Sequence, residues 1–350
     1  MEISRTSPLI AVVILNWNGE RLLREYLPKV AATTDRTISR IIVADNGSTD
    51  GSLDYIRSTF GKEVEIISFD RNYGFAEGYN RAIAALDSDF RYAVLLNSDV
   101  ATVEGWDRAL LQYMEAHPET AACQPKLLSY PRPDTFEYAG AAGGYIDRHG
   151  YPYCRGRIFA TCEKDKGQYD SEAYVFWASG ACLMIRRELY LHTGGLDPKF
   201  FAHMEEIDLC WRLQLAGYRC AAVPAATAYH LGGGSLPAES PRKTYLNFRN
   251  NLLMLHKNLP EDCRKSFLLR RRLLDTIAWA KYVLTFDFAN AKAIWKAHRD
   301  FASMRREYAC SATENLLDKE PESRISILWQ YYILGRRSFA EIKKHRHADL

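Results

Sequence analysis

The chain has 350 residues, of which 47% are hydrophobic and 25% are charged, and its formal net charge is +3. This ordinary globular composition excludes an intrinsically disordered chain, and no apolar stretch approaches the roughly 20 residues of a membrane-spanning helix. The eight cysteines are scattered without a Cys-x-x-Cys pair. Their spacing argues against a zinc knuckle or a redox dithiol and predicts reduced thiols in a cytoplasmic protein.

Charge is distributed unevenly along the chain. Residues 241–350 contain 22 Lys and Arg against 12 Asp and Glu, whereas residues 1–240 contain 24 against 31. The basic part carries no recognisable nucleic-acid motif, so we expect no nucleic-acid partner. Its Leu, Trp and Phe residues at helical spacing leave three expectations open: a solvated helical extension, peripheral contact with an anionic membrane surface, or a homo-oligomer contact.

The first 125 residues alternate between apolar strands and amphipathic helices. Strands are predicted at 9–15, 40–44, 64–68 and 92–96, and helices at about 20–31, 50–59, 75–86 and 105–116. This rhythm, with its short links, predicts an α/β fold in which a mainly parallel central sheet is flanked by helices. In such sheets ligands bind beyond the carboxyl ends of the strands, so the loops after these strands should carry the site.

The periodicity fails between about 128 and 172, in a stretch rich in Gly, Tyr, Pro and Arg. Long irregular segments in compact domains are more often functional than idle, and we expect this one to shape the acceptor side of the site. Further strands are predicted at 181–186 and about 219–223, and further helices at about 187–192 and 205–216. From about residue 240 the chain should be mostly helical.

Two predicted strands end in acids, namely Asp45 after strand 40–44 and Asp99 after strand 92–96. Such an Asp more often caps a helix or forms a turn than binds a ligand. His230 stands before a Gly-rich segment, and a single His is usually structural. Together, however, Asp99 and His230 could supply oxygen and nitrogen ligands to one divalent ion, with a diphosphate filling the remaining positions.

A cluster of acids opens the helix predicted at about 205–216. Glu205 and Asp208 share one face with Arg212, and Glu206 points elsewhere. Acids at a helix start are often only favourable partners of the helix dipole. If this helix start lies beside the strand ends, burial would instead raise a carboxyl pKa and prepare a general base.

Six segments in order resemble the family 2 glycosyltransferases, including their rhamnosyltransferase-like branch, over about residues 8–235. They are Val13–Gly19, Val43–Gly51, Arg71–Ala76, Leu95–Asp99, Ser179–Ala181 and Glu205–Asp208 with Arg212. The resemblance implies a GT-A fold, a nucleotide-diphosphate sugar donor, a divalent metal and inversion at the anomeric carbon.

The resemblance also implies roles for particular residues. Asp99 would be the last acid of an Asp-x-Asp metal motif, and His230 the later metal ligand. The first acid of that motif is replaced by Asn97, which leaves the metal affinity open. Glu206 stands where the family has its catalytic base, with Glu205 and Asp208 as rivals. The residues expected to contact the donor nucleotide are Asn16, Asn18, Asp45, Asn46, Arg71, Asn97 and Ser98.

The sequence therefore predicts an inverting, Mn²⁺- or Mg²⁺-dependent glycosyltransferase. It would move a hexosyl or deoxyhexosyl group from a UDP- or dTDP-sugar to a glycan or lipid-linked acceptor of a bacterial surface polysaccharide, in the cytoplasm or at the inner face of the membrane. Residues 1–240 would form the catalytic domain, with a nucleotide-binding half at about 8–125 and an acceptor half at about 126–240. Residues 241–350 would form a basic helical extension.

Other functions would require other features in the sequence. A nicotinamide-dependent dehydrogenase would show Gly-x-Gly-x-x-Gly after the first strand, where this chain has Asn16-Trp17-Asn18-Gly19. A nucleotidyltransferase would show a Gly-rich phosphate loop there. A non-catalytic sugar-nucleotide-binding or scaffold subunit of a glycan assembly complex remains the alternative, and the presence of Asp99, Glu206 and His230 argues against it.

Overall fold

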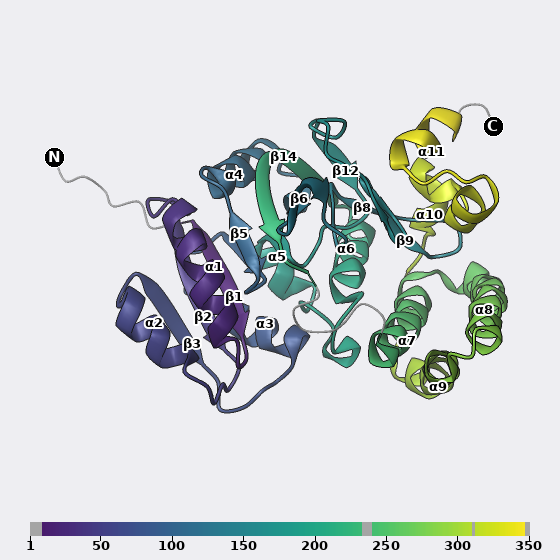
Figure 1. Cartoon of the computed structure of the whole chain (residues 1–350), viewed down its shortest axis with the longest axis horizontal. Coiled ribbons are helices and arrows are strands. Elements are labelled where there is room, and N and C mark those ends of the chain that lie inside the picture. The colour runs from purple at the N-terminus through teal and green to yellow at the C-terminus, as the bar shows by residue number, and fades with distance from the viewer. Residues whose placement is uncertain (1–8, 233–239, 310–311, 347–350) are drawn as a thin grey trace.

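A mixed ten-stranded sheet lies at the centre of the computed structural model, which describes residues 9–232, 240–309 and 312–346 (Figure 1). The strand order is β12-β14-β6-β13-β4-β1-β2-β3, with β5 paired to β14 and β7 paired to β6. The strands are β1 (Ile10–Asn16), β2 (Ser39–Asp45), β3 (Val64–Ser68), β4 (Tyr92–Leu96), β5 (Val100–Thr102), β6 (Thr120–Ser129), β7 (Arg132–Phe136), β12 (Ala173–Val175), β13 (Cys182–Arg186) and β14 (Arg219–His230).

The sheet is parallel in its first half, as the alternating pattern predicts. β3, β2, β1 and β4 run parallel to one another, and β14 is parallel to β6. β13 is antiparallel to both of its neighbours, β4 and β6, so the second half of the sheet is mixed. This reversal brings the start of β13 next to the carboxyl end of β4.

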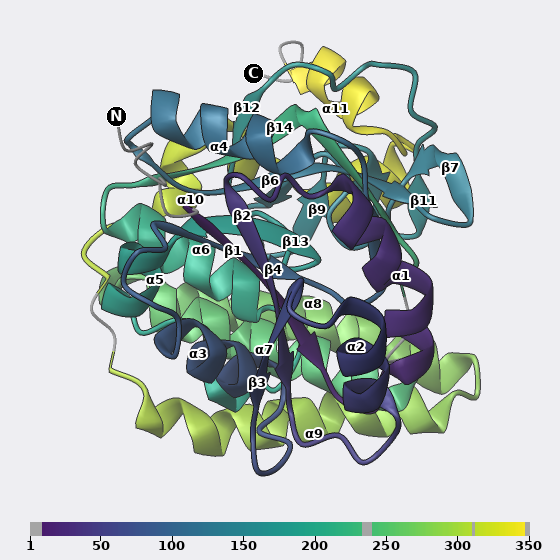
Figure 2. The same cartoon turned by 90° about the vertical axis from the view of Figure 1, so that its left-hand side faces the viewer.

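Helices cover both faces of the sheet, and β1 shows why. Ile10, Val12 and Ile14 pack into one core with helices α1, α2 and α4, whereas Ala11 and Val13 pack into another with α3, α5 and α6. Figure 2 shows α1 and α2 on one side of the first strands and α3 on the other. The bounds are α1 (Glu20–Thr33), α2 (Ser52–Phe60), α3 (Phe75–Ala84), α4 (Trp106–Ala116), α5 (Arg187–His192) and α6 (Glu205–Leu215).

The segment predicted to be irregular between 128 and 172 contains a second, antiparallel sheet. Its four strands are β8 (Gly144–Ile146), β9 (Pro152–Cys154), β10 (Arg157–Ile158) and β11 (Thr161–Cys162). The prediction of an irregular stretch was wrong here, because strands of two or three residues are too short to show alternation in a sequence.

Strand β14 is longer than the predicted 219–223. It continues to His230 past Pro224, and its register against β6 shifts between Val223 and Thr227. A proline cannot donate to the ladder, so strands accommodate one at such an irregularity. Because the strand is longer, its last residue, His230, lies opposite Val100 of β5.

Helices follow from residue 241, and the first of them belongs to the central core. Leu252, Leu253, Met254 and Leu255 of α7 are fully buried in the same core as Trp211 of α6. The expected domain boundary at residue 240 stays a prediction, and the hydrophobic core is continuous across it. The helices are α7 (Pro241–Asn258), α8 (Glu261–Leu284), α9 (Phe288–Met304), α10 (Leu316–Lys319) and α11 (Phe339–Arg346).

In Figure 1, α7, α8 and α9 lie together at the lower right, and α10 and α11 lie above them. Phe339 of α11 stacks on Tyr145 of β8 with ring centroids 5.5 Å apart. Among the described residues, no helix has both the length and the apolar character needed to cross a bilayer.

Candidate active site

The carboxyl ends of the first strands meet at one edge of the sheet. Asn16 of β1 is paired with Asp45 of β2, Asp45 is paired with Ser68 of β3, and Ile14 is paired with Leu96 of β4. The loops that follow these strands therefore lie side by side. This register places the predicted donor-binding residues along one edge.

Asn16 and Asp45 form a buried hydrogen-bonded pair. Asn16 Nδ2 donates to Asp45 Oδ1 at 3.0 Å and to Ser48 Oγ at 3.1 Å, and the Ser48 main-chain N–H donates to Asp45 Oδ2 at 3.0 Å. Both carboxylate oxygens thus have a donor, while Asn16 Oδ1 is buried without a partner. These contacts fix the orientation of Asp45.

The neighbouring predicted residues are tied into the same loops. Asn18 Oδ1 accepts from the main chain of Thr49 at 2.8 Å, and Asn46 Oδ1 accepts from that of Tyr73 at 2.9 Å. Arg71 is exposed, and its guanidinium lies over the Tyr73 ring at 4.9 Å. Arg71 is therefore free to approach a ligand, whereas Asn18 and Asn46 are already hydrogen-bonded within the loops.

Asp99 and His230 lie against each other across two strands. β5 pairs antiparallel with β14, and His230 stands opposite Val100, the residue after Asp99. His230 Nε2 lies 3.1 Å from Asp99 Oδ1. The pair is buried, while Asn97 and Ser98 before it are partly exposed, and the Asn97 main-chain N–H donates to the carbonyl of Ala181 at 3.0 Å.

A second carboxylate, which the sequence did not indicate, flanks His230. Glu137 Oε1 lies 3.3 Å from His230 Nδ1, and Glu137 Oε2 accepts from the main chain of Ala139 at 2.6 Å. Burial alone would lower the pKa of His230, but Asp99 and Glu137 outweigh it and raise that pKa to about 10. Glu137 lies in the segment expected to be irregular, and no motif surrounds it.

The donor set of Asp99 and His230 suits a divalent ion. When the ion displaces the proton between them, a carboxylate oxygen and an imidazole nitrogen about 3 Å apart can be adjacent ligands at bond lengths near 2.1 Å, as in an octahedral site. Among the described residues, no group of three or more His, Cys, Asp and Glu side chains is arranged to hold a metal ion. Two protein ligands would leave the remaining positions to substrate oxygens. The Gly-rich segment after His230 lies largely outside the described residues.

Glu205 and Glu206 open α6 in an apolar environment. Phe201, His203 and Met204, which precede them, all have positive φ angles between 67° and 75°, so the chain turns sharply into the helix. Each glutamate has one carboxylate oxygen that is buried without a hydrogen-bond partner. Burial, together with the neighbouring Glu206, raises the pKa of Glu205 well above its usual range, and burial raises that of Glu206 to about 7.

The start of the Glu206 side chain lies beside Gly180. A Cβ placed on Gly180 would lie 3.6 Å from Glu206 Cβ, so the first helical turn touches the segment before β13. Because the next residue, Ala181, accepts the hydrogen bond from Asn97, Gly180 connects the glutamate to the end of β4. The structure thus brings Glu206 near the Asn97–Asp99 turn.

Asp208 lies in a different environment. Its carboxylate is fully buried and accepts from Arg212 Nε at 2.8 Å, Lys257 Nζ at 2.9 Å and Asn258 Nδ2 at 2.8 Å. Although burial opposes it, the charges of Arg212 and Lys257 lower the pKa of Asp208. The carboxylate is engaged in holding α6 against α7.

A family model described as "Glycosyl transferase family 2" matches residues 11–192, which is more than half of the chain. The chain belongs to glycosyltransferase family 2. The N-acetylglucosaminyl-diphospho-decaprenol L-rhamnosyltransferase of Mycobacterium tuberculosis is 29% identical over 238 residues, 63% of this chain and 76% of that protein. Rhamnosyltransferase WbbL of Escherichia coli is 24% identical over 238 residues, 63% of this chain and 83% of that protein.

Solved structures agree with the family at the level of the fold. S. aureus TarS 1–349 in complex with UDP-GlcNAc has a TM-score of 0.56 and 13% identity, over 83% of this chain and 80% of that one. GalNAc-T7 with UDP, GalNAc and Mn²⁺ has a TM-score of 0.54 and 15% identity, over 71% of this chain and 48% of that one. The glycosyltransferase has the predicted GT-A fold.

Proposed function

We propose that this glycosyltransferase transfers a sugar from a nucleoside-diphosphate donor with inversion, using a divalent Mn²⁺ or Mg²⁺ ion. The observation that carries the proposal is the contact of Asp99 with His230, 3.1 Å apart at the end of β4. When bound between them, the ion would neutralise charge on the leaving diphosphate. The presence of Mn²⁺ in the GalNAc-T7 structure supports this kind of site.

Glu206 is the residue that we assign as the general base. Its carboxylate would take the proton of the acceptor hydroxyl while that oxygen forms the new bond to the anomeric carbon. The bond from that carbon to the diphosphate oxygen breaks on the opposite face, which inverts the configuration. A base works best with a pKa near the operating pH, and burial raises that of Glu206 to about 7.

Glu205 and Asp208 fit the role of base less well. Glu205 is more deeply buried than Glu206, and Asp208 is bound by Arg212, Lys257 and Asn258. A carboxylate that already accepts three charged or polar donors is a weak proton acceptor. We therefore assign Asp208 a positioning role.

The donor would be a UDP- or dTDP-sugar and the acceptor a lipid-linked glycan. The assignment of the donor is supported by Asn16, Asp45 and Arg71 at the edge of the sheet, and by the UDP-GlcNAc in the TarS complex. The assignment of the acceptor is supported by the name of the mycobacterial relative, which acts on a diphospho-decaprenol lipid. Synthesis of a surface polysaccharide is the process that would use such a product.

We also propose that α8 and α9 dock on an anionic lipid bilayer that holds this acceptor. Their exposed large apolar side chains are Leu269, Leu273, Ile277, Trp279, Leu284, Phe288 and Trp295, with Phe286 between the helices. The exposed charged residues from 263 to 299 are all basic: Lys265, Arg270, Arg272, Lys281, Lys292, Lys296 and Arg299. Apolar residues flanked by bases are the pattern of an interfacial helix on anionic lipid.

A metal titration tests the central proposal. Wild type, Asp99→Ala and His230→Ala would be titrated with Mn²⁺ in the presence of UDP or dTDP, with thermal shift as the readout. We expect the nucleotide and metal together to raise the melting temperature of wild type only, because ligand binding stabilises the folded state by mass action. An equal metal-dependent shift in both variants would contradict the site. Absence of nucleotide binding in wild type would favour the scaffold alternative.

A further inference from the structure

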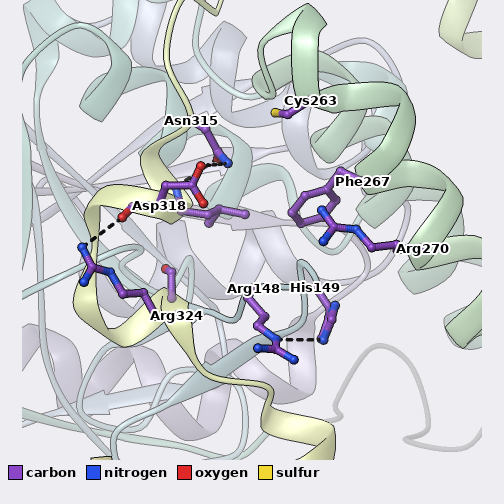
Figure 3. A pocket seen from close by; sticks show the side chains of 10 residues that line it. Arg148, His149, Cys263, Phe267, Arg270, Asn315, Asp318 and Arg324 are labelled. Atoms are coloured by element: carbon purple, nitrogen blue, oxygen red, sulfur yellow. Dashed lines mark hydrogen bonds between the residues drawn. The ribbon is translucent and has the colours of Figure 1, made fainter. Parts of the chain in front are cut away.

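A cavity of about 550 Å³ lies between α8, the β8–β9 turn and the segment around α10. Figure 3 shows three guanidinium groups around it: Arg324 on the left, Arg148 at the lower middle and Arg270 on the right. They come from three segments that are far apart in the sequence. Neither the donor-site residues Asn16, Asp45 and Asp99 nor the proposed base Glu206 lines this cavity.

The three guanidinium groups keep donors available. Arg148 Nε donates to His149 Nε2 at 3.2 Å, Arg324 donates to the main-chain carbonyl of Asp318 at 3.3 Å, and Arg270 lies over the Phe267 ring at 5.6 Å. In the parts of the chain that the structure describes, none of the three forms a salt bridge with an acid. One carboxylate, that of Asp318, lines the cavity, and it accepts from Asn315 Nδ2 at 2.8 Å.

Two neutral groups add donors to this cavity. Ser323 Oγ is fully buried, and it has no hydrogen-bond partner among the described residues. His149 Nε2 accepts from Arg148, so the proton of the neutral ring lies on Nδ1. Burial, and then the nearby charges of Arg148 and Arg270, lower the pKa of His149 to about 4, which keeps the ring neutral at pH 7.

We propose that this cavity binds a phosphate-bearing ligand, with Arg148, Arg270 and Arg324 as its charged contacts and Ser323 Oγ as a hydrogen-bond donor. The planar guanidinium group can donate two parallel hydrogen bonds to two oxygens of a tetrahedral phosphate. The volume lies within the range of small-molecule sites, so a diphosphate fits with room for the group that carries it.

The phosphate could belong to a free molecule or to a lipid headgroup. Arg270 belongs to α8, the helix that also carries the exposed Leu269, Leu273 and Ile277. Both sources share the same chemistry at the guanidinium groups. The proposal does not depend on the assignment of the donor site.

Titration calorimetry on the full chain in the presence of a chelator tests this inference. The probes are inorganic diphosphate and dihexanoyl phosphatidic acid below its micellar concentration. We expect the double variant Arg270→Gln with Arg324→Gln to weaken binding at least tenfold, because two charge-assisted contacts to the phosphate are lost. The matched control, Lys62→Gln with Lys166→Gln, removes the same charge from exposed sites that line neither the cavity nor the proposed lipid-binding face.

A loss confined to diphosphate would identify a free phosphate ligand, and a loss confined to the lipid would identify a headgroup. Equal affinity of the double variant and wild type for both probes would overturn the proposal, as would absence of binding by wild type or an equal loss in the control. Thermal unfolding of each variant shows that the comparison is made on folded protein. Ser323→Ala should weaken binding more mildly, by about threefold, because it removes one neutral hydrogen bond.

Discussion

Two carboxylates on one helix have opposite environments. Glu206 is partly buried, and one of its carboxylate oxygens is buried without a donor; desolvation raises its pKa to about 7, whereas Asp208 accepts from Arg212, Lys257 and Asn258, which lowers its pKa. Sequence spacing places the two on different faces of the start of α6 but does not give the environment of either. Their environments depend on which residues of α7 and of the segment before β13 lie opposite each of them.

This contrast predicts a stability effect for Asp208. Asp208→Asn should lower the free energy of unfolding by about 3 to 5 kcal/mol, because Lys257 and Arg212 lose a fully buried counter-ion. Turnover per folded molecule should change by less than about tenfold if the residue only positions the helix. Urea unfolding and a coupled assay for released nucleoside diphosphate measure the two quantities. A variant that unfolds like wild type but has no activity would contradict the positioning role.

At the level of elements, α7 holds the segment that leads into α6. Asn250 Nδ2 lies 2.8 Å from the carbonyl oxygens of Phe200, Ala202 and His203, and Arg249 donates to that of Phe200 at 3.0 Å. This segment contains the residues of positive φ before Glu205. α7 therefore determines how the glutamates meet the edge of the sheet.

Asn250→Ala should loosen this segment. We expect a loss of about 1 to 3 kcal/mol in stability, because buried carbonyl groups lose their donor. Turnover should fall further than this loss of folded protein explains, because the position of Glu206 is no longer fixed. Asn251→Ala is a matched control, since its amide donates to Gly150 away from the segment. Equal turnover per folded molecule in the two variants would contradict this role of α7.

The elements predicted from the sequence are those with a strong local pattern. The first four strands are continuous apolar runs, and the helices between them are amphipathic. Their observed bounds lie within two residues of the prediction. The strand predicted at 219–223 stops before Pro224, whereas β14 continues to His230. The register shift that accommodates the proline depends on pairing with β6, which the local sequence does not show. Glu137 and Asn250 could not be predicted as parts of the site, since their roles come from contacts with residues that are about 50 to 90 positions away.

At the level of the whole molecule, the exposed surface of α8 and α9 combines large apolar side chains with basic ones. The core is continuous across residue 240, so removing these helices would also disturb the catalytic part. A single exposed position is therefore the better probe. Arg271, next to Arg270 and Arg272, cannot serve, because it is buried and paired with Asp275 at 2.8 Å.

Leu273→Glu should reduce binding to vesicles rich in phosphatidylglycerol by about tenfold or more, because burying one such side chain contributes about 1.5 to 3 kcal/mol. Leu191→Glu, an exposed leucine on α5, should leave binding unchanged. Sedimentation with the vesicles gives the partition of each variant. Unchanged binding of Leu273→Glu would contradict docking through this face, and a dimer of wild type that this variant abolishes would identify a second copy of the chain as the partner.

The proposed mechanism depends most on Glu206 acting as the general base. The most direct test is the pH profile of nucleoside-diphosphate release with acceptor, for wild type and Glu206→Gln. Wild-type turnover should rise with pH through an apparent pKa near 7, because the base must be deprotonated and burial raises its pKa to about 7. Glu206→Gln should fold normally and lose about 10²- to 10⁴-fold of this activity, with no remaining pH dependence in that range. A folded Glu206→Gln variant that keeps wild-type turnover and the same profile would contradict the account.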